Sequence, residues 1–114
     1  MLQGYSKINA KINGKVYSLW VADSDEKRKR GLSGLDYLPE NHGMIFIYDT
    51  PVRAAFTMRD VYFPLTMLFL DEDFEIVHQE HCDSFQQGSI NPDVDFKYVI
   101  EFWKKYIYVL YIAL

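Results

Sequence analysis

Cysteine, proline and long apolar runs are scarce in this sequence of 114 residues, which has one Cys, four Pro and six Gly. The single cysteine, Cys82, cannot form an intrachain disulfide, so the fold is not expected to depend on an oxidising compartment. The N-terminus has no apolar segment after a basic start, which argues against a secretory signal. The most membrane-like run, Tyr106–Leu114, has nine residues, whereas a spanning helix needs roughly 20. We therefore expect no membrane span, and a cytoplasmic or virion-associated protein.

Length and composition predict a small globular domain that is mainly β. A chain of 114 residues has the size of one domain, so residues 1–114 are expected to form a single unit. Hydrophobic residues make up 49% and charged residues 25%, which is ordinary for a globular protein and excludes the disordered class. Nine Tyr and eight Phe favour strands, because aromatic side chains suit the half-buried surface of a sheet.

Charge is distributed unevenly along the chain. The net charge is −4, yet residues 1–30 contain seven Lys or Arg against three acidic residues, and residues 60–101 contain ten acidic residues against one Lys. The acidic total makes nucleic acid an unlikely main partner, because such binding depends on neutralising phosphates. A weak nucleic-acid site would lie in residues 7–30. Its densest run, Lys27–Arg30, is more simply a solvated helix face, since four consecutive residues spread around a helix.

The first third of the chain contains a hairpin signal followed by a helix signal. Residues 7–12 alternate polar and apolar, Asn13-Gly14 suits a type I′ turn, and residues 16–22 supply the partner strand. A short helix is predicted over about 24–33. Asp23 and Glu26 have capping-box spacing at its start, cations follow, and Gly31 or Gly34 closes it.

The rest of the chain is predicted to be strands and turns. Continuous apolar runs of strand length indicate strands that are covered on both faces, as in residues 65–70. The further predicted strands are 44–48, 54–58, 74–78, 96–101 and 106–113, with turns at 49–51 and 71–73 and a long loop at 83–95. Eight short strands with one small helix predict a compact antiparallel β-sandwich or barrel-like fold.

Several short blocks in the middle of the chain occur together in a recognisable order. They are Ala22-Asp23-Ser24, Arg30-Gly31-Leu32, Leu38-Pro39, Gly43-Met44-Ile45-Phe46, Phe56-x-Met58, Pro64-Leu65, Phe69-Leu70-Asp71 and Tyr98-Val99-Ile100-Glu101. As a set they resemble the uncharacterised family known as domain of unknown function 192 (DUF192), over roughly residues 15–101. The resemblance implies a compact antiparallel β fold with a short helix after the early strands. It brings no established activity.

The sequence departs from the family pattern at several polar positions. Relatives usually have Trp between the Phe and the Met, then Asn-Thr, then Pro-Leu-Asp, where this chain has Thr57, Asp60-Val61 and Thr66. The usual glycine after the acidic tip is replaced by Phe74, a residue that disfavours positive φ. A chemistry shared by the family, if one exists, is therefore expected to be altered or lost here.

The candidate ligand-binding residues are Arg59, Asp60, His42 and Glu101, which lie in or beside the family blocks. Arg59 suits a carboxylate or phosphate because a guanidinium binds such groups bidentately, and Asp60 is the alternative partner that would neutralise it. A small hydrolase or ligand-binding enzyme would use Arg59, Asp60 and a histidine. No complete catalytic set is present, so the inference leans away from an enzyme, and no cofactor is expected.

A second polar group, at residues 78–83, contains the metal-ligand types His78, His81, Cys82 and Asp83. In a strand these side chains point to opposite faces, and no second ligand cluster occurs elsewhere, so an exposed strand end is the preferred interpretation. Cys82 as a nucleophile would need a base nearby in space, and a small buried thiol is the alternative.

Function is not fixed by these patterns. The leading hypothesis is a non-enzymatic binding or structural module, such as an accessory piece of a larger assembly or a phage particle. The apolar segment Tyr106–Leu114 would complete the core as a strand, or would bind a partner or a second copy of the chain.

Overall fold

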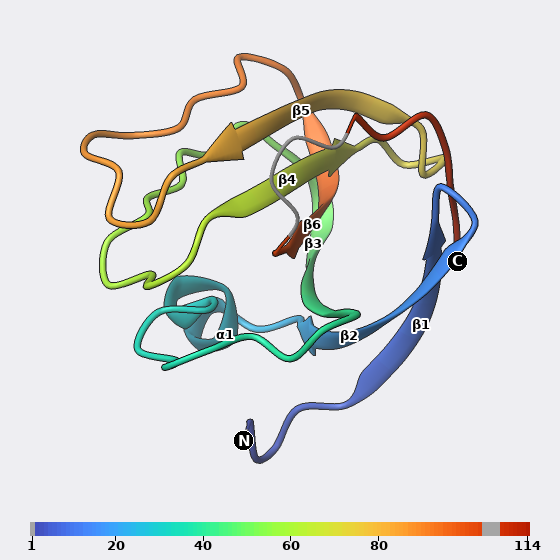
Figure 1. The fold of residues 1–114 in the computed structure, drawn as a ribbon. Helices are drawn as coiled ribbons and strands as arrows, with labels where there is room; N and C mark the ends of the chain where they lie inside the picture. The colour runs from blue at the N-terminus through green and yellow to red at the C-terminus, as the bar shows by residue number, and fades with distance from the viewer. Residues whose placement is uncertain (1, 104–107) are drawn as a thin grey trace.

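The computed structural model describes residues 2–103 and 108–114. Within these residues seven strands form one sheet in the order β5-β4-β6-β3-β2-β1-β7, which curls into a half-barrel (Figure 1). The elements are β1 Lys7–Ile12, β2 Lys15–Ala22, α1 Asp25–Arg30, β3 His42–Val52, β4 Leu65–Leu70, β5 Ile76–Cys82, β6 Phe96–Phe102 and β7 Ile112–Ala113. The predicted mainly β fold with one short helix is confirmed. Within the described ranges, no helix has the length and hydropathy to cross a membrane.

The early hairpin forms as predicted. β1 and β2 pair antiparallel from Lys7 opposite Trp20 to Ile12 opposite Lys15. Asn13 and Gly14 both take positive φ, 50° and 81°, as a type I′ turn requires.

Helix α1 is shorter than predicted and has a different N-cap. Ser24, rather than Asp23, caps the helix, and its hydroxyl accepts a hydrogen bond from the Lys27 backbone N–H at 3.2 Å. Gly31 ends the helix with φ of 52°, a value that favours glycine. The capping-box prediction was wrong because the chain enters the helix one residue later.

The sheet is not wholly antiparallel. β2 and β3 pair in parallel, from Ser18 opposite His42 to Ala22 opposite Phe46. Parallel neighbours need a long crossover, which residues 23–41 provide by way of α1. This crossover places the helix over one face of the sheet (Figure 1).

The prediction of two strands at 44–48 and 54–58 was wrong. β3 continues through Pro51 to Val52, with an irregularity in its pairing with β6 between Ile47 and Val52. Beyond it, Phe56 makes only an isolated bridge to Ile90. Pro51 does not end the strand, because this part of β3 is largely exposed and a missing backbone N–H is tolerated there.

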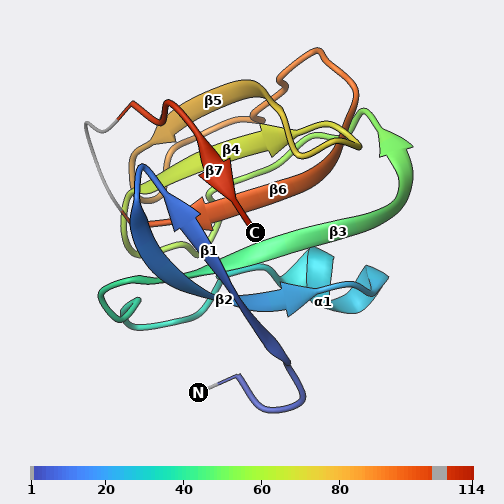
Figure 2. The same ribbon diagram turned by 90° about the vertical axis from the view of Figure 1, so that its right-hand side faces the viewer.

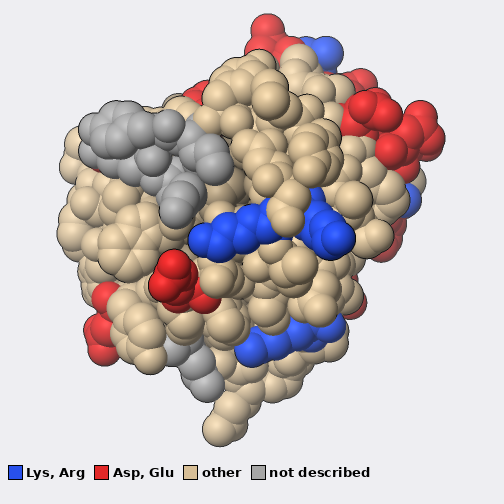
Figure 3. All heavy atoms as spheres, turned by 45° about the vertical axis from the view of Figure 1, so that its right-hand side comes forward, with Lys and Arg blue, Asp and Glu red and all other residues tan. Residues whose placement is uncertain are grey.

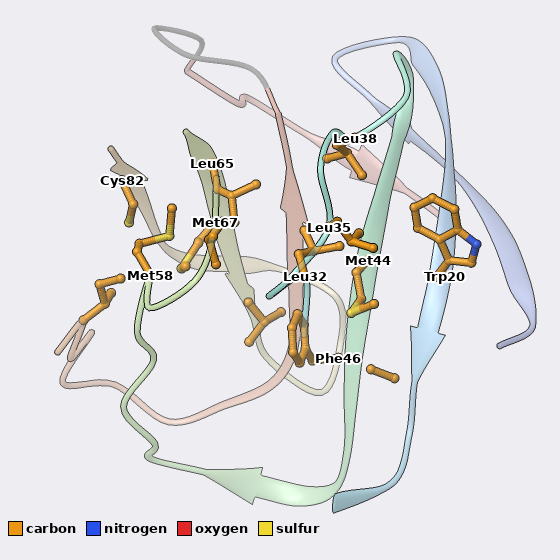
Figure 4. Packing of buried hydrophobic residues seen from close by; sticks show 14 of the residues in the cluster. Trp20, Leu32, Leu35, Leu38, Met44, Phe46, Met58, Leu65, Met67 and Cys82 are labelled. Atoms are coloured by element: carbon orange, nitrogen blue, oxygen red, sulfur yellow. The ribbon is translucent and has the colours of Figure 1, made fainter. Parts of the chain in front are cut away.

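Apolar side chains cover both faces of the sheet, in agreement with the continuous apolar runs. All six residues of β4 are buried. The inner cluster fills the curl and includes Leu19, Ile45, Leu68, Ile100 and Phe102. The outer cluster lies on the other face of the sheet and includes Trp20, Leu32, Phe46, Met58, Met67 and Cys82 (Figure 4).

Phe74, at the β4–β5 tip, adopts positive φ, at 62°. Two features support this conformation. Its ring stacks on Tyr98 with centroids 4.4 Å apart, and the Asp71 carboxylate accepts hydrogen bonds from the backbone N–H groups of Asp73 and Glu75. The turn therefore keeps its shape without glycine.

The C-terminal segment 108–114 closes the half-barrel. It runs from the β5 edge to the β1 edge, where Ile112–Ala113 pairs with Lys11 and Ile12 (Figure 2). The Gln79 side chain bonds both the N–H and the C=O of Val109, which is buried in the inner cluster. The strand predicted at 106–113 was therefore too long among the described residues, and residues 106–107 lie outside them.

Asn13 bonds this segment on either side of Val109, which gives a testable prediction. Its amide donates to Tyr108 O at 3.0 Å and accepts from Leu110 N at 2.8 Å. Asn13→Gly keeps the positive φ but removes these bonds, so we expect a loss of about 1–2 kcal/mol in unfolding free energy. Hydrogen exchange at the Leu110 amide should accelerate. Asn41→Gly, at another positive-φ position, is the control. Unchanged exchange at the Leu110 amide in Asn13→Gly would show that the Asn13 side chain does not hold this segment.

Candidate functional site

Three of the four predicted ligand-binding residues share one pocket. Arg59, Asp60 and Glu101 line a hollow of about 440 Å³ between the end of α1, β3 and residues 55–61. Its walls include the aromatic rings of Phe46 and Phe56. Residues far apart in sequence therefore converge on one site of the size that small-molecule pockets have.

Glu101 is the unusual member of this pocket. It lies on β6 between Met44 of β3 and Met67 of β4, on the outer face of the sheet, and only 5% of it is exposed. Its carboxyl group makes no hydrogen bond or ion pair with any other described residue. Burial raises the pKa of Glu101 to about 8, because a charged carboxylate is poorly solvated there. The group is thus mainly a neutral carboxylic acid at pH 7.

A tight turn positions Arg59 and Asp60 at the pocket mouth. Thr57 Oγ1 accepts from the Arg59 backbone N–H at 3.1 Å, and Val61 N donates to Met58 O at 3.0 Å. Asp60 takes φ of 59°, and its backbone C=O accepts from Gly34 N at 2.8 Å. This last bond fixes the turn to the segment that follows α1. Both side chains are exposed to solvent.

Arg28 and Tyr48 also line the pocket, and the sequence did not single them out. The Arg28 guanidinium donates to Ile47 O and to Asp25 Oδ1, both at 2.7 Å, and lies 4.9 Å from the Tyr48 ring centre. Burial raises the pKa of Tyr48, while Arg28 lowers it and Glu101 raises it further. Tyr48 is therefore close enough to respond to both groups. The basic run gave no sign that one of its members is tied to the sheet.

His42 lies apart from the pocket. It begins β3, its ring packs against Trp20 with centroids 5.3 Å apart, and its Nδ1 is 3.0 Å from Glu40 O. His42 stands beside the block that begins at Gly43, and its contacts are with Trp20 and Glu40 rather than with the pocket. A site that combines Arg59, Asp60 and this histidine does not form.

The side chains at 78–83 make separate contacts. His78 Nε2 is 2.9 Å from Glu80 Oε1, and His81 Nδ1 is 2.9 Å from Thr66 Oγ1. Cys82 is buried, and burial first, then nearby carboxylates, raises its pKa to about 12, which keeps the thiol protonated and unreactive. Among the described residues, no group of three metal-ligating side chains converges.

Several of the cations in residues 7–30 make their own contacts within the chain. Lys7 lies 5.0 Å from the Trp20 ring centre, and Lys27 lies 4.9 Å from that of Tyr5 and donates to Gly4 O. On the face shown in Figure 3, Lys and Arg form short separate strips between neutral side chains. The arrangement does not present one continuous basic surface on that face.

Fold and pocket together define a small curled-sheet domain with a buried acid at the base of its outer hollow. The chain belongs to the DUF192 family, described as "Uncharacterized ACR", whose pattern matches residues 8–112. The predicted membership is confirmed and extends beyond residues 15–101.

Two solved structures share this fold. A "putative transcription regulator" from Sinorhizobium meliloti is 25% identical, with a TM-score of 0.76 over 89% of this chain and 83% of its own. A protein of unknown function from Novosphingobium aromaticivorans is 18% identical, with a TM-score of 0.80 over 91% of this chain and 78% of its own. No curated protein is significantly similar to the chain. The comparisons therefore give a family and a fold without an assigned activity.

Proposed function

We propose that this protein is a non-enzymatic binding module that holds a small polar ligand in the pocket above Glu101. The carrying observation is the Glu101 carboxyl group, which is only 5% exposed, faces the pocket and makes no hydrogen bond or ion pair with any other described residue. No fully enclosed side-chain oxygen among the described residues lacks a partner, so the Glu101 oxygens are open to the hollow. A polar group in such a place is costly unless something hydrogen-bonds it. A ligand in the hollow would take the place of solvent as the hydrogen-bond partner of this carboxyl group.

A purely structural role explains Glu101 less well. Its strand neighbours across the sheet, Met44 and Met67, are apolar and fully buried, so an apolar residue would suit the same position. Functional sites commonly retain such unfavourable groups. The rigid support of Glu101 by two flanking strands would keep a bound ligand in one orientation.

The binding proposal is tested by an NMR titration of ¹⁵N-labelled protein at pH 7 with four probes of similar size: benzoate, phenyl phosphate, benzylamine and benzyl alcohol. We expect at least one probe to cause saturable shifts at the amides of Gly31, Ser33 and Arg59. Ala55→Trp, which places a large side chain at the pocket wall, should abolish the shifts. Val77→Trp, at an exposed side chain of β5 outside the pocket, should leave them unchanged. Absence of saturable shifts at these amides with all four probes would contradict the proposal.

A small hydrolase or ligand-binding enzyme is the second candidate. It is supported by the shared pocket of Arg59, Asp60 and Glu101, since a carboxylic acid with a raised pKa suits general acid–base chemistry. Among the described residues that line the pocket there is no histidine, so the histidine-dependent form has little support. Release of phenol from phenyl acetate at a rate that Asp60→Asn and Glu101→Gln both reduce would favour this candidate.

Nucleic-acid binding has weaker support. The name of the Sinorhizobium relative suggests regulation, and residues 7–30 are basic, but the contacts made by Lys7, Lys27 and Arg28 occupy those side chains within the chain. A cytoplasmic or virion-associated location stays a prediction, as do a place in a phage particle and self-association through the C-terminal segment. Tyr108, Leu110, Tyr111 and Leu114 are exposed and would form part of such a contact.

A further inference from the structure

The charges around the pocket point to the kind of ligand. Four Lys or Arg and two Asp line it in addition to Glu101, although the whole chain has a net charge of −4. With Glu101 neutral, the lining carries a net positive charge in an otherwise acidic protein. Such a hollow attracts anions and repels cations.

The individual charges are not equally available. Arg28 and Asp25 are 2.7 Å apart and largely neutralise each other. The Arg59 side chain makes no hydrogen bond or ion pair with any described residue, although Asp60 lies next to it in sequence. Arg59 is therefore the guanidinium at the mouth that is free to bind a ligand, and the exposed Lys29 and Arg30 add to the positive field.

Glu101 complements Arg59 at the inner end of the pocket. A neutral carboxylic acid has one O–H donor, and its partner of choice is an oxygen that bears negative charge. Phe46 and Phe56 give the hollow an apolar wall, and a volume of about 440 Å³ holds much more than an inorganic ion. The complementary ligand thus has an oxyanion and an apolar body.

We propose that the pocket binds a small carboxylate or phosphate compound with an apolar body, its oxyanion held between the Glu101 carboxyl group and the Arg59 guanidinium. The proposal rests on the proposed binding function and specifies its ligand class. Carboxylate and phosphate share the same recognition chemistry, a planar or tetrahedral set of charged oxygens that accept hydrogen bonds.

Titratable groups near Glu101 determine what a pH dependence would mean. Tyr48 and Cys82 both respond to Glu101, and both have raised pKa values, so they stay protonated below pH 9. The other charged groups that face the pocket are Asp25, Arg28, Lys29, Arg30, Arg59 and Asp60. No histidine is among the described lining residues, so Glu101 is the group expected to change its protonation between pH 6 and pH 9.

The test uses the full chain and the same four probes, with dissociation constants measured by NMR. Benzoate and phenyl phosphate should bind at least about tenfold more tightly than benzylamine and benzyl alcohol at pH 7. Benzoate should bind about tenfold more tightly at pH 6 than at pH 9, because the O–H donor is lost as Glu101 ionises. The affinities of benzoate and phenyl phosphate show whether the site prefers a carboxylate or a phosphate.

Variants separate the two ends of the site. Glu101→Gln keeps a neutral donor, so benzoate affinity should stay within about threefold at pH 6 and lose its pH dependence. Arg59→Gln should weaken benzoate about tenfold, whereas Arg53→Gln, whose guanidinium pairs with Asp93 and Asp95 outside this pocket, should not. Tighter binding of benzylamine than benzoate, or benzoate affinity that rises with pH, would overturn the oxyanion assignment while leaving the binding function intact.

Discussion

The Glu101→Gln variant is expected to gain stability relative to the unmodified protein as the pH rises, by about 4 kcal/mol between pH 5 and pH 9. The pKa of Glu101 rises from 4.5 to about 8 on folding because of burial. Between those values the folded state holds a proton that the unfolded state has lost, so stability falls as pH rises through this window. Glutamine does not titrate, so this part of the pH dependence disappears.

Urea unfolding at pH 5, 7 and 9 measures this effect from the difference in unfolding free energy between the two proteins. Because both proteins have the same histidines, the difference between them removes the contribution of histidine titration to the pH dependence. Glu75→Gln is the matched control on the exposed β4–β5 tip and should follow the profile of the unmodified protein. Parallel profiles for Glu101→Gln and the unmodified protein would show that Glu101 is not a buried acid.

Gly43→Ala is expected to destabilise the fold by about 3 kcal/mol or more, the largest effect of a single methyl group that the structure predicts. A Cβ at Gly43 would collide with the backbone carbonyl oxygen of Glu101 and press on Leu19 and Phe102. Because the Cβ would collide with a backbone atom of the paired strand β6, the collision can be removed only if β3 and β6 move apart. That movement would also displace Glu101 from the pocket.

Thermal and urea unfolding of Gly43→Ala measures the loss, with Gly88→Ala as the comparison. Gly88 has φ of 84° but open space around its Cβ position, so its replacement should cost only about 1 kcal/mol. Equal effects of the two substitutions would mean that the close β3–β6 approach is not the cause. NMR shifts at the pocket amides of Gly43→Ala would report the movement of Glu101.

Local signals in the sequence predicted the elements well and their pairing poorly. The Asn13-Gly14 turn predicts the early hairpin and the apolar run 65–70 predicts a strand, and each signal depends only on residues close together in the sequence. The parallel β2–β3 pair was missed because a crossover through α1 depends on tertiary packing. The continuation of β3 through Pro51 was missed for a related reason, since only an exposed strand position tolerates that residue.

Some of the residues that line the pocket were predicted from the sequence. Arg59, Asp60 and Glu101 were singled out because they stand in or next to family blocks, and the fold brings them together. The burial of Glu101 was not predictable from Val-Ile-Glu-Phe, because alternation along β6 does not say which face is covered by α1 and the loops. Arg28 was hidden in a basic run of which it is one of four members.

The central claim is that Glu101 is a neutral acid that faces the pocket and has no hydrogen-bond partner among the described residues, and its side-chain carboxyl ¹³C resonance tests this most directly. Selective labelling of Glu and comparison with Glu101→Gln assigns the signal, which is then followed from pH 3 to pH 10. A midpoint near 8 in the free protein, moved upward when benzoate is bound, is the result that the structure predicts. A midpoint near 4.5 that benzoate does not move would contradict it.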